Sequence, residues 1–168
     1  LRAVLWCGKP AVIDADGLNN LDDELKKLLS LRHVLTPHPG EMARLTGKSI
    51  EDVLRDPAGF AENTAKAFGC IVLLKGAVSV AAHPAGRLRY NASGNPGLAK
   101  GGSGDVLTGI ITALLAQGLE PFDAASAGAY ILGSSAESAL ELLHERALTA
   151  GDVLDAIEKT AGITEHRN

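Results

Sequence analysis

A glycine-rich stretch at residues 91–109 constrains this chain more than any other segment. It reads NASGNPGLAKGGSGDVLTG, with four glycines within eight residues just before Asp105 and a strongly apolar helical pattern. Glycines let a backbone adopt positive φ and approach a ligand closely, and the free N–H groups at a helix start attract phosphate. The stretch therefore predicts an anion-binding loop that opens a helix. A plain glycine-rich connection before a buried helix is the alternative.

Two familiar glycine motifs do not fit this stretch. Gly97 and Gly102 have the spacing of the G-x-x-x-x-G-K-[ST] phosphate loop, but Ser103 stands where that loop has lysine. A dinucleotide-binding G-x-G-x-x-G that begins at Gly102 would need glycine where Leu107 stands. The loop is thus of another type, and Asp105 has two readings: it complements the helix dipole, or it accepts a proton beside a bound phosphate.

Composition narrows the class of protein. The chain has 168 residues, 46% of them apolar, which suits a single soluble domain with a substantial core. A net charge of −4 and 4% aromatic residues disfavour nucleic acid as a partner. No apolar run approaches the roughly 18 residues that span a membrane.

Cys7 and Cys70 form no metal-binding pair, so we expect two buried thiols in a reducing compartment, the cytoplasm. His33, His83, His144 and His166 have no metal-like spacing and are expected at the surface.

The apolar pattern alternates between short strands and helices. Strands are predicted at residues 11–13, 34–35, 71–74, 78–82 and 87–90, the last two as a hairpin. Helices are predicted at residues 1–6, 21–29, 41–45, 57–68, 124–143 and 149–161, besides the largely buried helix that the glycine loop opens. Such alternation indicates an α/β domain with a mostly parallel sheet.

Polar residues follow several of these strands. Asp14 and Asp16 come after the first strand, and we expect at most one of them to face a given ligand. His38, held between two prolines, and Glu41 follow the second strand, and Lys75 follows the third. Since ligands of α/β sheets bind beyond the carboxyl ends of the strands, these residues and the glycine loop are expected to converge. Taken singly, Lys75 also fits a lysine at the sheet rim, and Glu41 a first-turn helix acid.

Together these motifs resemble the nucleotide-dependent NAD(P)H-hydrate dehydratases, a branch of the ribokinase-like superfamily. The resemblance covers residues 10–157 and rests on Thr36-Pro37-His38-Pro39-Gly40-Glu41, on Leu74-Lys75-Gly76, and on the long motif from Gly94 to Leu107, after the Asp14 to Asn19 block. It implies a three-layer α/β/α fold, with residues 1–168 forming one domain whose N-terminal strands are missing from this chain. It also implies a fusion to an epimerase domain in a longer protein, and a homo-oligomer.

The resemblance implies a hydro-lyase that repairs NADH or NADPH to whose nicotinamide ring water has added. ADP or ATP, with Mg²⁺, would phosphorylate the ring hydroxyl of the S epimer, and phosphate would then leave. Asp105 would be the catalytic base and would contact the substrate together with His38 and Asn95. The phosphate loop would consist of Gly101, Gly102, Ser103 and Gly104.

The nucleotide-binding residues implied by the resemblance lie at the end of the third strand and at the helix start. They are Lys75, Gly76, Ala77, Val78, Ser79 and Gly104. Glu41 occupies the place of an acid that contacts magnesium through water in related kinases.

Two other functions remain open at this stage. A kinase of the same superfamily, acting on a vitamin precursor, would use the same loop and Asp105 but release a phosphorylated product; such kinases tend to have asparagine at the position of His38. The third possibility is a nucleotide-binding module without turnover. The sequence does not distinguish ADP from ATP, or NADH hydrate from NADPH hydrate.

Overall fold

A five-stranded sheet forms the centre of the structure, a computed structural model that describes residues 1–141 and 144–165. The strands lie in chain order: β1 (Ala11–Ile13), β2 (His33–Leu35), β3 (Ile71–Leu74), β4 (Ser79–Ala82) and β5 (Leu88–Asn91). β1, β2 and β3 pair in parallel, whereas β4 runs antiparallel to both β3 and β5. Four of the five strands therefore share one direction, as the sequence predicted.

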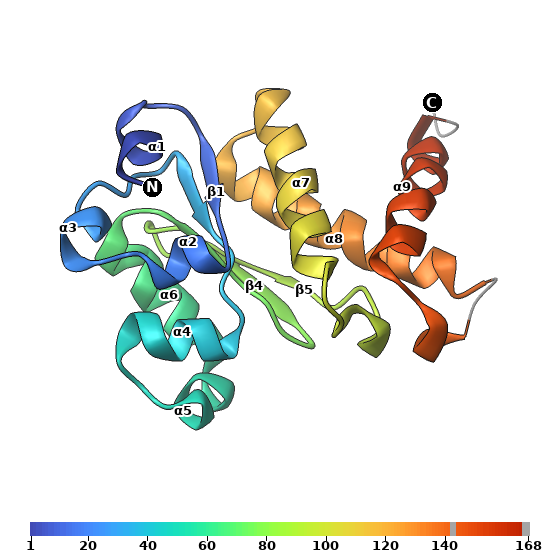
Figure 1. Cartoon of the computed structure of the whole chain (residues 1–168), viewed down its shortest axis with the longest axis horizontal. Coiled ribbons are helices and arrows are strands. Elements are labelled where there is room, and N and C mark those ends of the chain that lie inside the picture. The colour runs from blue at the N-terminus through green and yellow to red at the C-terminus, as the bar shows by residue number, and fades with distance from the viewer. Residues whose placement is uncertain (142–143, 166–168) are drawn as a thin grey trace.

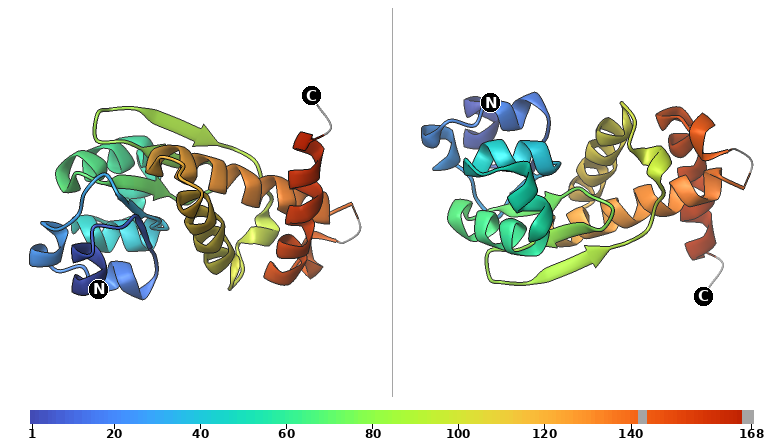
Figure 2. Two further views of the ribbon diagram at one scale, coloured as in Figure 1. Left: turned by 90° about the horizontal axis from the view of Figure 1, so that it is seen from above. Right: turned by 90° about the horizontal axis from the view of Figure 1, so that it is seen from below.

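Six helices cover one face of the sheet (Figures 1 and 2). They are α1 (Arg2–Trp6), α2 (Asp16–Asn19), α3 (Asp23–Lys26), α4 (Pro39–Thr46), α5 (Ile50–Arg55) and α6 (Pro57–Phe68). Each contributes at least one buried apolar residue to a core shared with Leu35, Val72 and Leu74 of the sheet. The alternation of side chains along β2 and β3 sends these residues to one face and their neighbours to the other.

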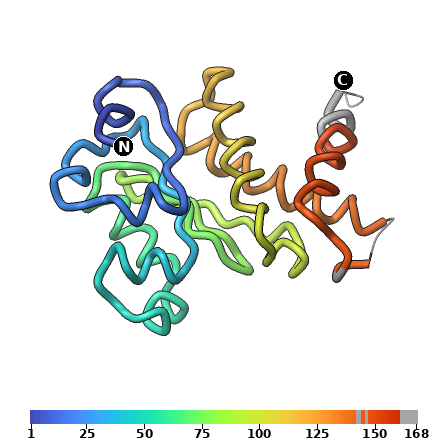
Figure 3. The backbone as a smooth tube through the Cα atoms, in the orientation of Figure 1, coloured from blue at the N-terminus to red at the C-terminus, as the bar shows by residue number. Residues whose placement is uncertain are grey.

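The other face is covered by α7 (Ser103–Ala116) and α8 (Pro121–Ala139), and α9 (Ala150–Glu165) packs on α8. Short 3₁₀ turns at Pro96–Leu98 and Glu145–Ala147 connect this layer. Its core joins Val34, Ile71 and Leu73 of the sheet to apolar residues of all three helices. Figure 3 shows α9 packed beyond α8, at the opposite end of the molecule from the N-terminus. The predicted three-layer α/β/α architecture is thus confirmed.

Local signals place most element boundaries. Gly47 and Gly69 end α4 and α6 in the left-handed conformation, and Pro57 begins α6, as glycine and proline commonly do. Thr149 and Asp152 form the predicted capping box at the start of α9. The helix expected at residues 124–143 instead spans Pro121–Ala139, and residues 142–143 lie outside the described residues.

The helix α7 is less buried than its apolar sequence suggested. Leu107, Ile111 and Leu115, spaced by four residues, form its buried stripe. The neighbouring apolar residues are only partly covered: Val106, Ile110 and Leu114. One face of α7 therefore packs on β1 and α8, and the rest of the apolar arc borders solvent in this chain.

Two expectations about single side chains were wrong. Cys70 is buried, and burial raises the pKa of its thiol to about 12, but Cys7 is exposed. His33 is buried rather than at the surface, because it opens the doubly covered strand β2. His166 lies outside the described residues. Across the residues that the structure describes, no helix has the length and apolarity to cross a bilayer.

His33 is expected to make stability depend on pH. Its Nδ1 accepts a hydrogen bond from the Ser30 N–H (3.0 Å), and within the described residues its buried Nε2 has no partner. Burial, and then the nearby Arg32 charge, lower the pKa of His33 below its ordinary value of 6.5. The unfolded chain therefore takes up the proton first, and the free energy of unfolding should fall as pH drops through that value, by at most about 1.4 kcal/mol per pH unit from this group.

Denaturant unfolding between about pH 8 and about pH 5.5 tests this expectation. In the His33→Gln variant, the free energy of unfolding should decline less over this pH range than in wild type. Part should persist, because burial and then Arg87 also lower the pKa of His83. An equally steep decline in wild type and variant would contradict the assignment to His33.

Candidate functional site

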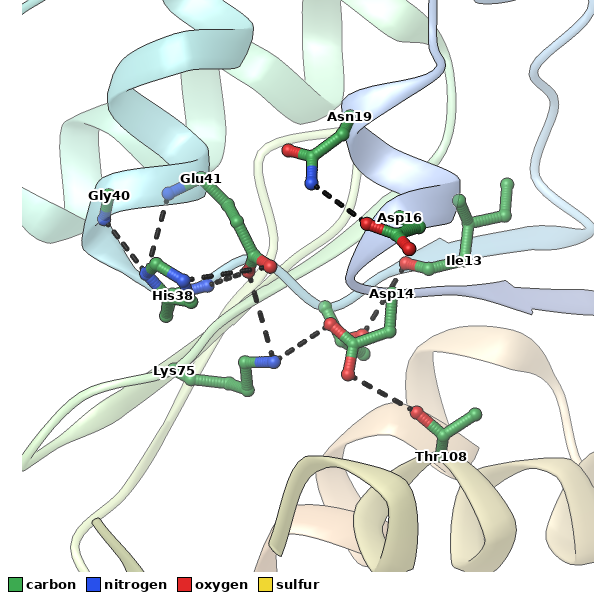
Figure 4. A network of polar contacts seen from close by, with 10 residues as sticks. Ile13, Asp14, Asp16, Asn19, His38, Gly40, Glu41, Lys75 and Thr108 are labelled. Atoms are coloured by element: carbon green, nitrogen blue, oxygen red, sulfur yellow. Dashed lines mark hydrogen bonds and ion pairs between the residues drawn. The ribbon is translucent and has the colours of Figure 1, made fainter. Parts of the chain in front are cut away.

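Four segments that are distant in sequence meet at the carboxyl ends of the parallel strands (Figure 4). Asp14 follows β1, His38 and Glu41 follow β2, and Lys75 follows β3. The first turn of α7 completes the group, since a Cβ at Gly104 would lie 3.2 Å from Asp14 Oδ2 and 3.7 Å from Lys75 Nζ. The predicted convergence of these residues with the glycine loop is therefore present in the fold.

Lys75 lies at the centre of the polar contacts. Its ammonium donates to Asp14 Oδ1 at 2.8 Å and lies 4.0 Å from Glu41 Oε2. The backbone N–H of Lys75 donates to the Pro37 carbonyl at 2.8 Å, which continues the parallel pairing beyond β3. The lysine side chain is 23% exposed, so it is partly withdrawn from water but still reachable by a ligand.

His38 and Glu41 cap the start of α4 reciprocally. His38 Nδ1 accepts from the N–H groups of Gly40 (3.0 Å) and Glu41 (3.4 Å), while Glu41 Oε2 accepts from the His38 N–H (2.8 Å). An accepting Nδ1 carries no proton, so the neutral imidazole has its hydrogen on Nε2, which lies 3.6 Å from Glu41 Oε1. The imidazole is half exposed and the carboxylate is almost fully buried. His38 therefore presents an N–H edge at the rim of the site.

The glycine loop reaches α7 through a left-handed residue, Gly102, with φ of 93°. A Cβ there would meet Ala150 at 3.0 Å, whereas Gly101 has open space around it. Ser103, at the first position of α7, is buried. Asp105 lies in the first helical turn with an exposed side chain. In the described part of the chain its carboxylate has no hydrogen bond or ion pair, so it is available to a ligand.

The turn between β3 and β4 contains the other residues predicted to bind nucleotide. Gly76, Ala77 and Val78 are exposed, and the turn is closed by a 3.4 Å hydrogen bond from the Gly76 N–H to Ser79 Oγ. Val78 belongs to this turn rather than to β4, which begins one residue later than predicted. The turn borders Lys75 and offers backbone groups and an apolar side chain to a ligand.

Asn95 is held against α8. Its Nδ2 donates to the Ala136 carbonyl at 3.0 Å, and its Oδ1 accepts from the Gly97 N–H at 3.0 Å. Gly97 has no room for a side chain, since a Cβ would lie within 3.0 Å of Asn95, Leu148 and Glu145. The amide of Asn95 thus shapes the approach to the glycine loop, and its contact with substrate stays a prediction.

The turn after β1 is strained. Ala15 has φ of 47° and ψ of −119°, and among the described residues it is the only non-glycine with positive φ. Such conformations are costly for a residue with a Cβ and concentrate at functional sites. The turn sends Asp14 toward Lys75, while the exposed Asp16 is the first residue of α2 and accepts a hydrogen bond from the Asn19 side chain. One of the two carboxylates faces the site, as the sequence predicted.

Sequence reasoning missed Thr108. Its hydroxyl donates to Asp14 Oδ2 at 3.4 Å, from one turn beyond Gly104 on α7. The spacing of four residues puts both positions on one helix face, so the signal was present once Gly104 was placed at the site.

The sequence matches known proteins over almost its whole length. A family model described as NAD(P)H-hydrate dehydratase matches residues 1–159. The chain is 47% identical over 148 residues to a bifunctional NAD(P)H-hydrate repair enzyme Nnr of Moorella thermoacetica, covering 87% of this chain and 28% of that protein. It is 44% identical over 153 residues to the ADP-dependent (S)-NAD(P)H-hydrate dehydratase of Neisseria meningitidis, covering 88% of this chain and 52% of that one.

A solved structure gives the same result. The ADP/ATP-dependent NAD(P)H-hydrate dehydratase of Bacillus subtilis, co-crystallised with ATP and Mg²⁺, matches with a TM-score of 0.78 at 31% identity, covering 90% of this chain and 54% of that one. The chain thus spans about half the length of these dehydratases and less of the bifunctional relative. The fold is also that of a ribokinase-like superfamily protein of Enterococcus faecalis, with a TM-score of 0.68. By the match over residues 1–159, together with this fold and the converging motifs, the chain belongs to the NAD(P)H-hydrate dehydratase family.

Proposed function

We propose that this chain carries the nucleotide-dependent dehydration of hydrated NADH or NADPH. The observation that carries the proposal is the meeting of the α7 N-terminus, at Gly104, with the Lys75 ammonium at one sheet edge. Asp105 lies in the same helical turn, and its carboxylate has no partner among the described residues. A helix N-terminus and a cation together can bind a phosphoryl group. An available carboxylate can accept the proton of a hydroxyl group that attacks the phosphorus atom. The named dehydratases at 44% and 31% identity support the choice of substrate.

In the proposed reaction, the ring hydroxyl of the hydrate attacks the terminal phosphoryl group of the nucleotide. Asp105 takes the hydroxyl proton as the new O–P bond forms and the bond to the leaving phosphate oxygen breaks. Loss of the phosphate from the ring carbon, with a ring proton, then restores the nicotinamide double bond. The N–H groups from Gly101 to Gly104 would stabilise the transferring group, and such positioning and neutralisation supply most of the catalysis in phosphoryl transfer.

The remaining side chains divide between the two ligands. The residues Lys75 to Ser79 would hold the nucleotide, and His38 would meet the hydrated dinucleotide through its Nε2–H. Asn95 would contact the same substrate after a change in its present bonds.

Magnesium would be held chiefly by the nucleotide phosphates. In the described residues no three His, Cys, Asp or Glu side chains lie close enough to form a metal site. Mg²⁺ in nucleotide enzymes keeps several waters and uses one or two carboxylates. The oxygens of Glu41 suit this chemistry, and a contact through water fits because its carboxylate already caps α4. The metal would neutralise charge on the phosphates.

The test is a repair assay on this chain. Hydrated NADH or NADPH is incubated with ADP or ATP and Mg²⁺, and the recovery of reduced-dinucleotide absorbance is measured. The dehydratase of Neisseria meningitidis serves as the positive control. Nucleotide-dependent recovery supports the proposal. Nucleotide binding without recovery would contradict it and favour a binding module, and stable phosphorylation of a vitamin precursor alcohol would favour a kinase.

A further inference from the structure

We propose that Asp14 is a positioning residue that fixes the Lys75 ammonium beside the first turn of α7. The inference rests on the proposed function, because Lys75 is assigned there to the nucleotide. Asp14 itself is given no contact with either substrate.

The contacts of Asp14 tie three segments together. One carboxylate oxygen accepts from Lys75 at 2.8 Å, and the other accepts from Thr108 on α7 at 3.4 Å. The Asp14 carboxylate is 12% exposed, so the ion pair with Lys75 is largely shielded from solvent. Partly buried pairs are screened less by salt than surface pairs, and they hold their geometry better.

The space around Gly104 shows where this arrangement puts the ammonium. A Cβ on Gly104 would lie within 4 Å of both the Asp14 carboxylate and the Lys75 nitrogen. Lys75 is therefore anchored at the positive end of α7, where a phosphate would receive backbone N–H groups. Without the carboxylate, the flexible lysine stem would leave the ammonium free to adopt other positions, with Glu41 at 4.0 Å as the nearest alternative partner.

The strained turn at Ala15 is an independent sign that the position of Asp14 is enforced. The backbone adopts a costly conformation immediately after Asp14, and the surrounding contacts must maintain it. The same turn offers a matched control. Asp16 lies two residues further on and is exposed, and among the described residues its side chain accepts a hydrogen bond only from Asn19 of its own helix α2.

The first test is a mutant cycle in the repair assay. Asp14→Asn should lower kcat about a hundredfold with a small change in KM for the hydrated dinucleotide, as expected when a catalytic cation is misplaced by about 1 Å. Asp14→Glu should recover part of this loss, and Asp16→Asn should leave kcat unchanged. Because Asp14 acts through Lys75, the Asp14→Asn/Lys75→Met double variant should be no slower than Lys75→Met alone. Additive losses, or an unchanged kcat in Asp14→Asn, would overturn the inference.

The second test does not depend on activity. Nuclear magnetic resonance of the lysine ammonium groups should show a slowly exchanging Lys75 signal in wild type, assigned by its loss in Lys75→Met. The signal should disappear in Asp14→Asn and persist in Asp16→Asn. If the repair assay is silent but the signal behaves in this way, the proposed function fails and the placement of Lys75 by Asp14 stands. A signal that persists in Asp14→Asn overturns the inference whatever the assay gives.

Discussion

Replacing Asp105 with asparagine is expected to abolish turnover and to leave nucleotide binding nearly intact. Asparagine preserves the size of the side chain but cannot accept the hydroxyl proton, and positioned general bases contribute about 10²–10⁴-fold to rates. Asp105 is exposed and, in the described part of the chain, unpaired, so its replacement breaks no bond of the fold. The repair assay should therefore show a loss of at least about a hundredfold, while calorimetry with ADP shows a similar affinity.

The structure provides a matched control for the alternative role of Asp105, in which its charge only complements the helix dipole. Asp123 is the third residue of α8, as Asp105 is of α7, and it pairs with Arg89 near the amino end of β5. If Asp105 only complemented the helix dipole, both Asp→Asn variants would lose about 0.3–1 kcal/mol of stability and keep their activity. Turnover retained by Asp105→Asn would refute its assignment as the base. Turnover lost in Asp123→Asn as well would show that the assay reports stability rather than proton transfer.

The convergence of the site could be predicted from sequence because it follows from topology. A continuous apolar run such as Ile71–Leu74 identifies a strand covered on both faces, and parallel strands deliver the residues after them to one edge. Lys75, His38 and the glycine loop could therefore be placed together without coordinates. That only one of Asp14 and Asp16 faces the site was also expected, but strand alternation would have put these two positions on one face. The turn at Ala15, after which Asp16 begins α2, separates them.

The contacts within the site could not be predicted in the same way. The choice of Asp14 over Asp16 depends on the backbone at Ala15, whose positive φ no propensity scale anticipates for alanine. The hydroxyl of Thr108 reaches Asp14 only because the fold packs α7 against β1. The burial of His33 likewise depends on a turn in which its own Nδ1 satisfies the N–H of Ser30. A hydrophobic pattern predicts helices, strands and their buried faces, but it does not predict individual side-chain contacts of this kind.

The approach to the glycine loop depends on close packing against α8. Ser93 Oγ donates to Asn91 Oδ1 at 2.8 Å, the Gly94 N–H donates to Glu137 Oε1 at 2.7 Å, and Asn95 bonds to α8 as well. The backbone of Ser93 can come this close because α8 has glycine at position 133. A Cβ on Gly133 would lie 2.1 Å from Ser93 Oγ and 2.6 Å from the Ser93 carbonyl carbon and oxygen.

Gly133→Ala is therefore expected to destabilise the protein by about 2 kcal/mol or more, because the obstacle includes backbone and the helix or the strand-to-loop segment must shift. Gly109→Ala is the matched control: it also places alanine within a helix, but on an exposed position with nothing within 4 Å. Helix propensity predicts that this control gains about 0.5–1 kcal/mol. Denaturant unfolding of both variants should thus give shifts of opposite sign. Equal stability gains in the two variants would mean that residues 91–95 do not lie against α8. Other contacts would then have to hold the glycine loop in position.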